Sequence, residues 1–159
     1  MLKFREITKE DNPRIAAIIR AVMQSFNADP ATTILGDPVV DRMFESYQVE
    51  RAVYYVALLD GEVVGGCGIK ALDGGPEGVA ELQRMFLKPE ARGLGIAGQL
   101  MERCLHKAAD FGYRQVYLET LGDMLPARAL YRKYGFSEIS QPMGNTGHGG
   151  CDIRMLKEL

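Results

Sequence analysis

A glycine-rich turn between a predicted strand and a predicted long helix constrains this chain more than any other feature. The turn, Arg92-Gly93-Leu94-Gly95-Ile96-Ala97-Gly98, follows a β-rich run at 79–87 and opens a helical apolar stripe that begins at Ile96. Another β-rich run lies at 115–120, so the order strand, helix, strand predicts a right-handed crossover joining two parallel strands. Free backbone N–H groups at a helix start, with small residues beside them, indicate a site for a phosphate or another anion.

The remaining elements extend this unit into a mixed sheet. Asp60-Gly61 joins β-rich runs at 53–59 and 62–72 and predicts a tight antiparallel hairpin. Apolar periodicity and turn residues predict further strands at 2–7, 136–139 and 152–156, and helices from Asp11 or Asn12 to Phe26, from 39 to about 51, and at 126–134. We therefore expect an α/β fold of the α+β type, with a single mixed β-sheet flanked by helices in one domain over residues 1–159.

Charge and cysteine content exclude several classes of function. The 159 residues carry 19 Lys and Arg against 21 Asp and Glu, so neither a nucleic acid nor a membrane is expected as the main partner. Cys67, Cys104 and Cys151 fit neither a disulfide framework nor a zinc knuckle, and we expect no metal. With no signal peptide or membrane span expected, the predicted location is the cytoplasm.

The glycines also satisfy a second pattern, the GxGxxG of dinucleotide-binding folds. Gly93, Gly95 and Gly98 match it, and Glu119 stands where such a fold places a ribose-binding acid. Two features weigh against this alternative. Residues 88–92 separate the turn from its strand, and an antiparallel hairpin precedes a unit that should open the fold.

A different frame, Arg92-x-x-Gly95-x-Ala97, resembles the GNAT family of acyl-CoA-dependent N-acetyltransferases. The flanking segments, Glu81-Leu82-Gln83-Arg84-Met85-Phe86-Leu87 before the turn and Ala127-Arg128-Ala129-Leu130-Tyr131-Arg132-Lys133-Tyr134-Gly135-Phe136 after it, are similar to that family's segments in the same order. The resemblance is strong from about Val79 to Phe136 and implies a GNAT-like acyl-CoA N-acyltransferase fold with acetyl-CoA as co-substrate.

The resemblance implies a set of cofactor-binding residues along the strand, the turn and the short helix. The backbone of the turn would hold the pyrophosphate, the strand before it would pair with the amides of the pantetheine arm, and the start of the short helix would lie beside that arm. The residues so implied are Met85, Phe86, Leu87, Arg92, Gly93, Leu94, Gly95, Ile96, Ala97 and Ala127. The alternation of apolar and polar residues expected of a half-buried strand fails at 85–87. This pattern fits either a doubly buried strand or the bulge that this family uses there.

Acetyl transfer from a thioester to an amine needs a neutral amine and a proton for the leaving thiolate. The resemblance implies Glu81 as general base, provided that its surroundings raise its pKa; the alternative is a solvated or ion-paired carboxylate at a strand end. Tyr131 occupies the family's Leu-Tyr position and would protonate the thiolate, although its helical spacing alone indicates a core tyrosine. A backbone N–H near Met85 or Phe86 would bind the oxyanion.

One position departs from the family pattern. Met124 stands where many members have an asparagine that binds the pantetheine arm, so an apolar or backbone contact is expected instead. His148, in a glycine-rich loop at 144–151, is a candidate for contact with the acceptor, although a loop histidine is more often simply solvent-exposed. Met23, Phe26, Met43, Phe44 and Tyr47 could line the acceptor pocket, and core packing explains them equally well.

The sequence thus predicts an acetyl-CoA-dependent N-acetyltransferase that moves the acetyl group to a primary amine by direct attack in a ternary complex. The acceptor is a small-molecule or peptide amine of unidentified structure, and a homodimer is compatible with the family. An acyl-CoA-binding sensor or docking module of the same fold, without turnover, is the alternative.

Overall fold

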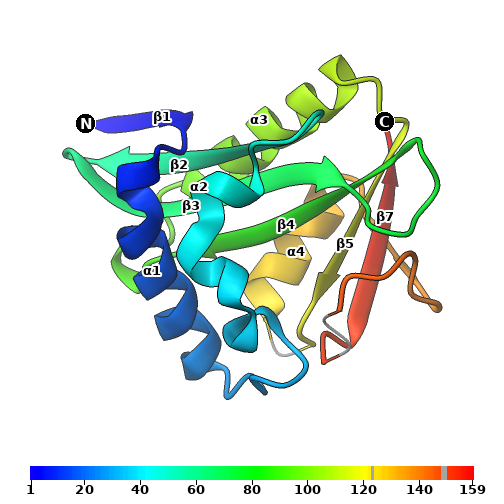
Figure 1. The fold of residues 1–159 in the computed structure, drawn as a ribbon, viewed down its shortest axis with the longest axis horizontal. Coiled ribbons are helices and arrows are strands. Elements are labelled where there is room, and N and C mark those ends of the chain that lie inside the picture. Colours follow the sequence, from blue (N-terminus) through cyan, green and yellow to red (C-terminus); the bar gives the residue numbers. More distant parts are fainter. Residues whose placement is uncertain (123, 148–149) are drawn as a thin grey trace.

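The computed structural model describes residues 1–122, 124–147 and 150–159, which form a seven-stranded mixed sheet with helices on both faces (Figure 1). The strands lie in the order β1-β2-β3-β4-β5-β7-β6. Their bounds are β1 Leu2–Glu6, β2 Val53–Leu59, β3 Glu62–Ala71, β4 Val79–Leu87, β5 Gln115–Thr120, β6 Ser137–Ile139 and β7 Ile153–Glu158. The helices are α1 Asn12–Ser25, α2 Met43–Ser46, α3 Ile96–Asp110 and α4 Leu125–Lys133, with short 3₁₀ helices at Lys9–Asp11, Ile34–Gly36, Pro38–Arg42 and Pro89–Ala91.

The sheet combines an antiparallel hairpin with one parallel pair, as the sequence predicts. Asp60 and Gly61 both have positive φ angles, 51° and 84°, which is the backbone of the predicted two-residue turn between β2 and β3. Within the described residues β4 and β5 form the single parallel pair, and α3 makes the crossover between them. Gly112, just after α3, has a φ of 87° and ends this helix as a glycine cap does.

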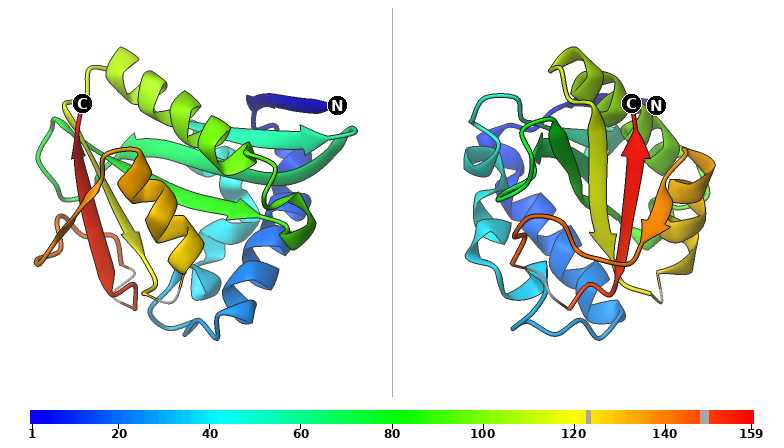
Figure 2. Two further views of the ribbon diagram at one scale, coloured as in Figure 1. Left: turned by 180° about the vertical axis from the view of Figure 1, so that it is seen from behind. Right: turned by 90° about the vertical axis from the view of Figure 1, so that its right-hand side faces the viewer.

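Two apolar cores hold the helices against the sheet. α3 and α4 cover one face, where Leu100, Cys104 and Tyr131 pack against residues of the central strands. α1 and α2 cover the other face, where Ile15, Ile19 and neighbouring side chains meet β2 and Phe86 of β4. Figures 1 and 2 show these two helical layers on opposite sides of the strands. No helix of the described segments is long and apolar enough to cross a bilayer.

The helix predicted from 39 to about 51 is wrong in extent. Its residues form a 3₁₀ helix at Pro38–Arg42 and a single α-helical turn, α2. Arg42 leaves helical geometry, with φ −132° and ψ 42°, and the amide of Phe44 donates instead to Asn12 Oδ1 at 2.8 Å. A contact with α1 therefore replaces the helical hydrogen bond, and periodicity alone gives no sign of it.

Candidate active site

The site lies where β4 and β5 separate. The two strands pair only through Val79, Ala80 and Glu81 of β4, and beyond Glu81 no described strand pairs with the β5-facing side of β4. Both ribbons start together and then diverge (Figure 1). An unpaired strand edge offers backbone N–H and C=O groups to an extended ligand that carries amides.

Two cavities lie in the wedge between the diverging strands β4 and β5. They share the lining residues Met85, Phe86, Met124 and Ala127. The inner cavity, of about 90 Å³, is bordered by Glu81, Glu119 and Tyr131. The outer cavity, of about 390 Å³, extends from the end of β4 to the glycine turn and the first turn of α4. The shared walls connect the glycine turn to the buried carboxylate and the buried tyrosine.

A β-bulge shapes the strand edge. Gly66 of β3 lies opposite Phe86, whereas Gly68 lies opposite Gln83, so Arg84 and Met85 together face one residue of β3. Arg84 has a φ of 57°, and its carbonyl accepts a hydrogen bond from Tyr54 Oη at 2.7 Å. Of the two explanations for the broken alternation at 85–87, the structure has the bulge.

The glycine turn leaves its amides free. Gly95 precedes α3 with a φ of 77°, and Gly93 has the same angle. In the described chain, none of the N–H groups of residues 93–98 has a hydrogen-bond partner. Residues 92–95 are exposed, while Ile96 is buried and anchors the helix. Free amides at the positive end of a 15-residue helix form a cradle for an anion.

Glu81 is a buried carboxylate with an amide neighbour. It is 8% exposed, and Gln83 Nε2 donates to its Oε1 at 2.7 Å. Tyr47 Oη in turn donates to Gln83 Oε1 at 2.6 Å, which fixes the orientation of the amide. Burial raises the pKa of Glu81 to about 7, with the nearby Glu119 adding to the rise and Gln83, Arg84 and Lys70 opposing it.

Tyr131 combines a core position with access to the inner cavity. It is 7% exposed and packs edge-on against Phe136, with ring centroids 6.0 Å apart. Its hydroxyl makes no hydrogen bond to any residue in the described ranges. Burial raises the pKa of Tyr131 well above its usual value, so the phenol is protonated at neutral pH.

The start of α4 forms an apolar wall. Ala127 borders both cavities, as does Met124, whose Sδ accepts a hydrogen bond from Thr120 Oγ1 at 3.6 Å. The sulfur is thereby turned toward β5. Met124 thus presents apolar surface where many members of the family have an asparagine, as the sequence predicts, and it borders both cavities.

A family model described as the acetyltransferase (GNAT) family matches residues 14–136, which is more than half of the chain. The chain belongs to this family.

Comparison with individual proteins agrees with this assignment. The uncharacterized N-acetyltransferase YjgM of Escherichia coli K12 is 40% identical over 157 residues, covering 98% of this chain and 93% of that protein. A GNAT-family acetyltransferase from Staphylococcus aureus Mu50 has the same fold, with a TM-score of 0.88 at 18% identity over 100% of this chain and 99% of that one. A GNAT superfamily phosphinothricin acetyltransferase from Sinorhizobium meliloti, solved in complex with AcCoA, gives a TM-score of 0.78 at 26% identity, covering 99% and 88%.

The predicted GNAT family, fold and N-acetyltransferase class are therefore confirmed. The dinucleotide-binding alternative is wrong, because the sheet of this GNAT protein is antiparallel apart from β4 and β5, and a 3₁₀ helix separates β4 from the turn. The residue roles inferred for Glu81, Tyr131 and the turn stay predictions. Of the apolar residues offered for an acceptor pocket, Met23 borders the inner cavity and Phe26 the outer one, whereas Met43, Phe44 and Tyr47 border neither.

Three charged or amide side chains that border the inner cavity were not singled out as site residues by the sequence: Gln83, Arg84 and Glu119. Arg84 lies in the bulge of β4, Gln83 directly precedes it, and Glu119 comes from β5, where the sequence suggested it only for the dinucleotide alternative. Cys151 also borders the cavity. Burial raises the pKa of its thiol to about 12, so it is a poor nucleophile at neutral pH. The prediction for His148 falls outside the described residues.

The described residues contain no group of three or more His, Cys, Asp and Glu that could hold a metal ion. The polar groups that border the two cavities include backbone amides, the carboxyl groups of Glu81 and Glu119, the phenol of Tyr131 and the side chains of two arginines, Arg84 and Arg92. Such a set suits an anionic ligand at the turn and proton transfer in the inner cavity.

Proposed function

We propose that this GNAT protein is an acetyl-CoA-dependent N-acetyltransferase that acetylates a primary amine by direct attack within a ternary complex. One observation carries the proposal: the free amides of residues 93–98 and the unpaired edge of β4 border an outer cavity, which shares walls with an inner cavity that holds both a carboxylate with a pKa of about 7 and a protonated tyrosine.

The wedge suits coenzyme A in its two chemically distinct parts. A diphosphate fits the free amides at the start of α3, where the helix dipole favours negative charge. An arm with secondary amides fits the unpaired backbone of β4 at residues 85–87 in the manner of an added strand. Ala127 and Met124 supply an apolar wall on the other side.

Glu81 is placed to take the proton that the attacking amine loses. A lysine-like amine has a pKa of about 10.4 and is almost wholly charged at neutral pH, so it must be deprotonated before attack. A carboxyl with a pKa of about 7 is ionised in a useful fraction there and is a stronger base than an ordinary glutamate. Gln83, held by Tyr47, positions the carboxylate.

Tyr131 supplies the second proton transfer. The bond that breaks lies between the acyl carbon and sulfur, and the thiolate must gain a proton as it leaves. The pKa of a thiol is about 8.5, whereas burial keeps the Tyr131 phenol protonated and its hydroxyl free of other hydrogen bonds to the described residues. Backbone N–H groups near the bulge are the donors for the oxygen that becomes negative during attack.

The test is release of free thiol from acetyl-CoA with a panel of amines, using wild type and Tyr131→Phe. We expect kcat to fall about a hundredfold or more in the variant while affinity for coenzyme A changes little, because the phenol acts on the leaving group. Tyr55→Phe is the matched control, since Tyr55 is partly buried on β2 and borders neither cavity.

Two outcomes would contradict the proposal in different ways. Equal turnover in Tyr131→Phe and wild type would remove the acid assignment alone. Thermal stabilisation by coenzyme A without thiol release from any amine would indicate the alternative, a binding module that senses acyl-CoA.

A further inference from the structure

Arg84 carries a positive charge that forms no ion pair with a carboxylate of the described residues, although it lies near enough to Glu81 to lower the pKa of that carboxyl, and its guanidinium lies over the ring of Tyr47 at 5.5 Å. Its Nη1 donates to Ser46 Oγ at 3.0 Å, its Nε is buried without a hydrogen-bond partner, and no described carboxylate forms an ion pair with it. The residue nonetheless borders the inner cavity. A partly buried guanidinium without a counter-ion is unfavourable, and it favours any anion that enters beside it.

The residues that border the cavity carry charges of both signs. Glu81 and Glu119 both border it, and Glu119 is held by Tyr117 Oη and Thr146 Oγ1, each at 2.6 Å. Arg84 borders the same cavity, three residues after Glu81 on β4. Lys70, the next nearest cation, donates to the carbonyl of Ser46 at 2.9 Å and does not border the cavity. A simple amine would therefore match the carboxylates and leave the guanidinium unpaired.

We propose that the acceptor is a small amino-acid-like molecule, in which Arg84 binds a carboxylate or similar anionic group while Glu81 and Glu119 receive the amino group. This inference rests on the proposed function and names its substrate class. A planar guanidinium binds a carboxylate through two parallel N–H donors, which a lysine cannot do.

The size and spacing of the cavity limit the acceptor further. Its volume of about 90 Å³ is well below the roughly 300–1,000 Å³ typical of sites for drug-sized ligands. Glu81 and Arg84 are three residues apart on one strand, so their Cα atoms are separated by at most about 10 Å. The small volume, with residues of both charges on its border, favours an acceptor whose amino and anionic groups are close together.

The first experiment needs no variant. Each of several L-amino acids is compared as an acceptor with its methyl ester and with the amine produced by its decarboxylation, and thiol release is followed. We expect kcat/KM to be at least about tenfold higher for the free amino acid in the pairs that react. Equal or better use of the esters and amines would overturn the inference and leave the proposed function intact.

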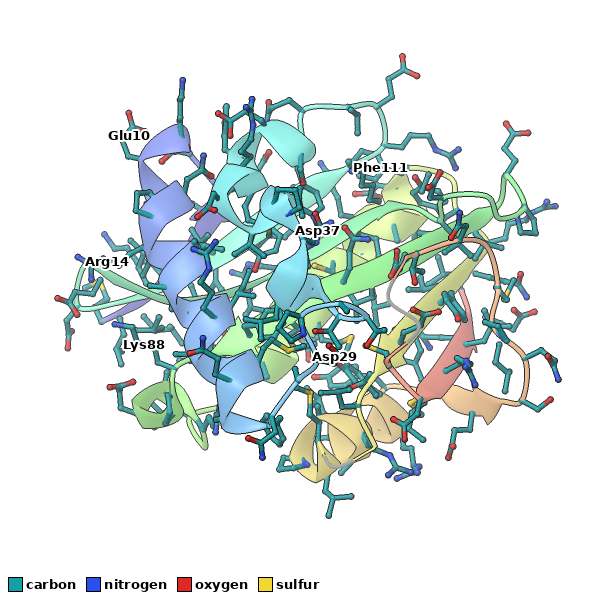
Figure 3. The ribbon with its side chains drawn as sticks, turned by 60° about the horizontal axis from the view of Figure 1, so that its bottom comes forward. Glu10, Arg14, Asp29, Asp37, Lys88 and Phe111 are labelled. Atoms are coloured by element: carbon teal, nitrogen blue, oxygen red, sulfur yellow. The ribbon has the colours of Figure 1, made fainter. Side chains whose placement is uncertain are left out.

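The second experiment uses Arg84→Gln and Arg84→Lys. The preference for an amino acid over its decarboxylated amine should fall about ten- to a hundredfold in Arg84→Gln, mainly through KM, and recover in part in Arg84→Lys. Arg14→Gln is the charge-matched control, because Arg14 is exposed on α1 and points away from the molecule (Figure 3). An unchanged preference in Arg84→Gln would overturn the inference.

Thermal stabilisation by coenzyme A separates this inference from the proposed function. Stabilisation without thiol release from any member of any pair would contradict the proposed function, and the substrate class with it. Thiol release from decarboxylated amines alone would contradict only the role of Arg84.

Discussion

At the scale of single residues, the central question is how Glu81 obtains a pKa near neutrality. Burial at 8% exposure disfavours the charged form, and Glu119 adds like-charge repulsion. The amide of Gln83 and the cations Arg84 and Lys70 act in the opposite direction, so the pKa stops at about 7. The balance leaves a carboxylate that can accept a proton at physiological pH and still release it.

Glu81→Gln tests this balance through the pH dependence of kcat/KM. In wild type the profile should change slope near pH 7, where Glu81 ionises, and again at the pKa of the amine itself. In Glu81→Gln the break near pH 7 should vanish and kcat/KM at pH 7 should fall about a hundredfold or more. A break that persists near pH 7 in Glu81→Gln would assign it to another group.

Gln83→Met is the matched variant for the same measurement, because it keeps the length of the side chain and removes the amide. The hydrogen bond from Gln83 lowers the pKa of Glu81, so its loss should move the break to higher pH. A purely structural role for Gln83 would lower the rate and leave the break in place.

At the scale of elements, the glycine turn and the edge of β4 work as a pair. Gly95 adopts a φ of 77° before α3, and apart from its two chain neighbours no described residue has an atom within 4 Å of the position that a Cβ would take. Space is therefore available for a side chain at this position, and the constraint is the left-handed backbone that aims the amides.

Gly95→Ala should consequently weaken binding of coenzyme A as well as the fold. The left-handed conformation costs an alanine about 1–2 kcal/mol, and relaxation of that strain would turn the amides away from the diphosphate. Gly61→Ala is the matched control, since Gly61 has a φ of 84°, equally open surroundings and a place in the hairpin away from the turn. Calorimetric titration should find weaker binding of coenzyme A only in Gly95→Ala. Equal affinities in the two variants would contradict the role of the turn amides in binding the diphosphate.

Local signals predicted most of these elements. The Asp60-Gly61 turn, the stripe of α3 and the glycine turn each depend on residues close together in the sequence, and each lies where it was expected. The only sequence signal of the bulge at Arg84 was a break in the alternation of apolar and polar residues, because the positive φ of Arg84 depends on pairing with β3 and on Tyr54. The prediction of a helix from 39 to about 51 was wrong for a similar reason, because the backbone amide of Phe44 donates to Asn12 Oδ1 on α1, a contact distant in sequence.

The candidate site was predictable to the extent that it follows the family pattern. Glu81 and Tyr131 were identified from motifs, and both border the inner cavity. Gln83, Arg84 and Glu119 were not identified as site residues, because their meeting depends on the separation of β4 from β5 and on partners such as Tyr47. Spacing along the sequence does not predict such contacts between distant residues.

At the scale of the whole molecule, the buried carboxylate links the chemistry to stability. Glu81 ionises at about 7 in the folded state and near its usual 4.5 when unfolded. Between these values the folded state binds the extra proton, so the free energy of unfolding must fall as the pH rises through this window and level off above it. Burial alone would raise the pKa of Asp11, but hydrogen bonds from Arg5 and from the backbone of Thr8 outweigh it and lower that pKa, so Asp11 acts in a separate window below about pH 3.8.

Glu81→Gln should therefore stabilise the protein in a pH-dependent manner. The free energy of unfolding of the variant should match that of wild type near pH 4.5 and exceed it by roughly 3 kcal/mol at pH 8, since the glutamine never carries the charge whose burial is costly. Urea denaturation of both proteins at several pH values measures this difference. A difference that does not change with pH would mean that Glu81 is already ionised at little cost in the folded state, and its assignment as a base poised near neutrality would fail with it.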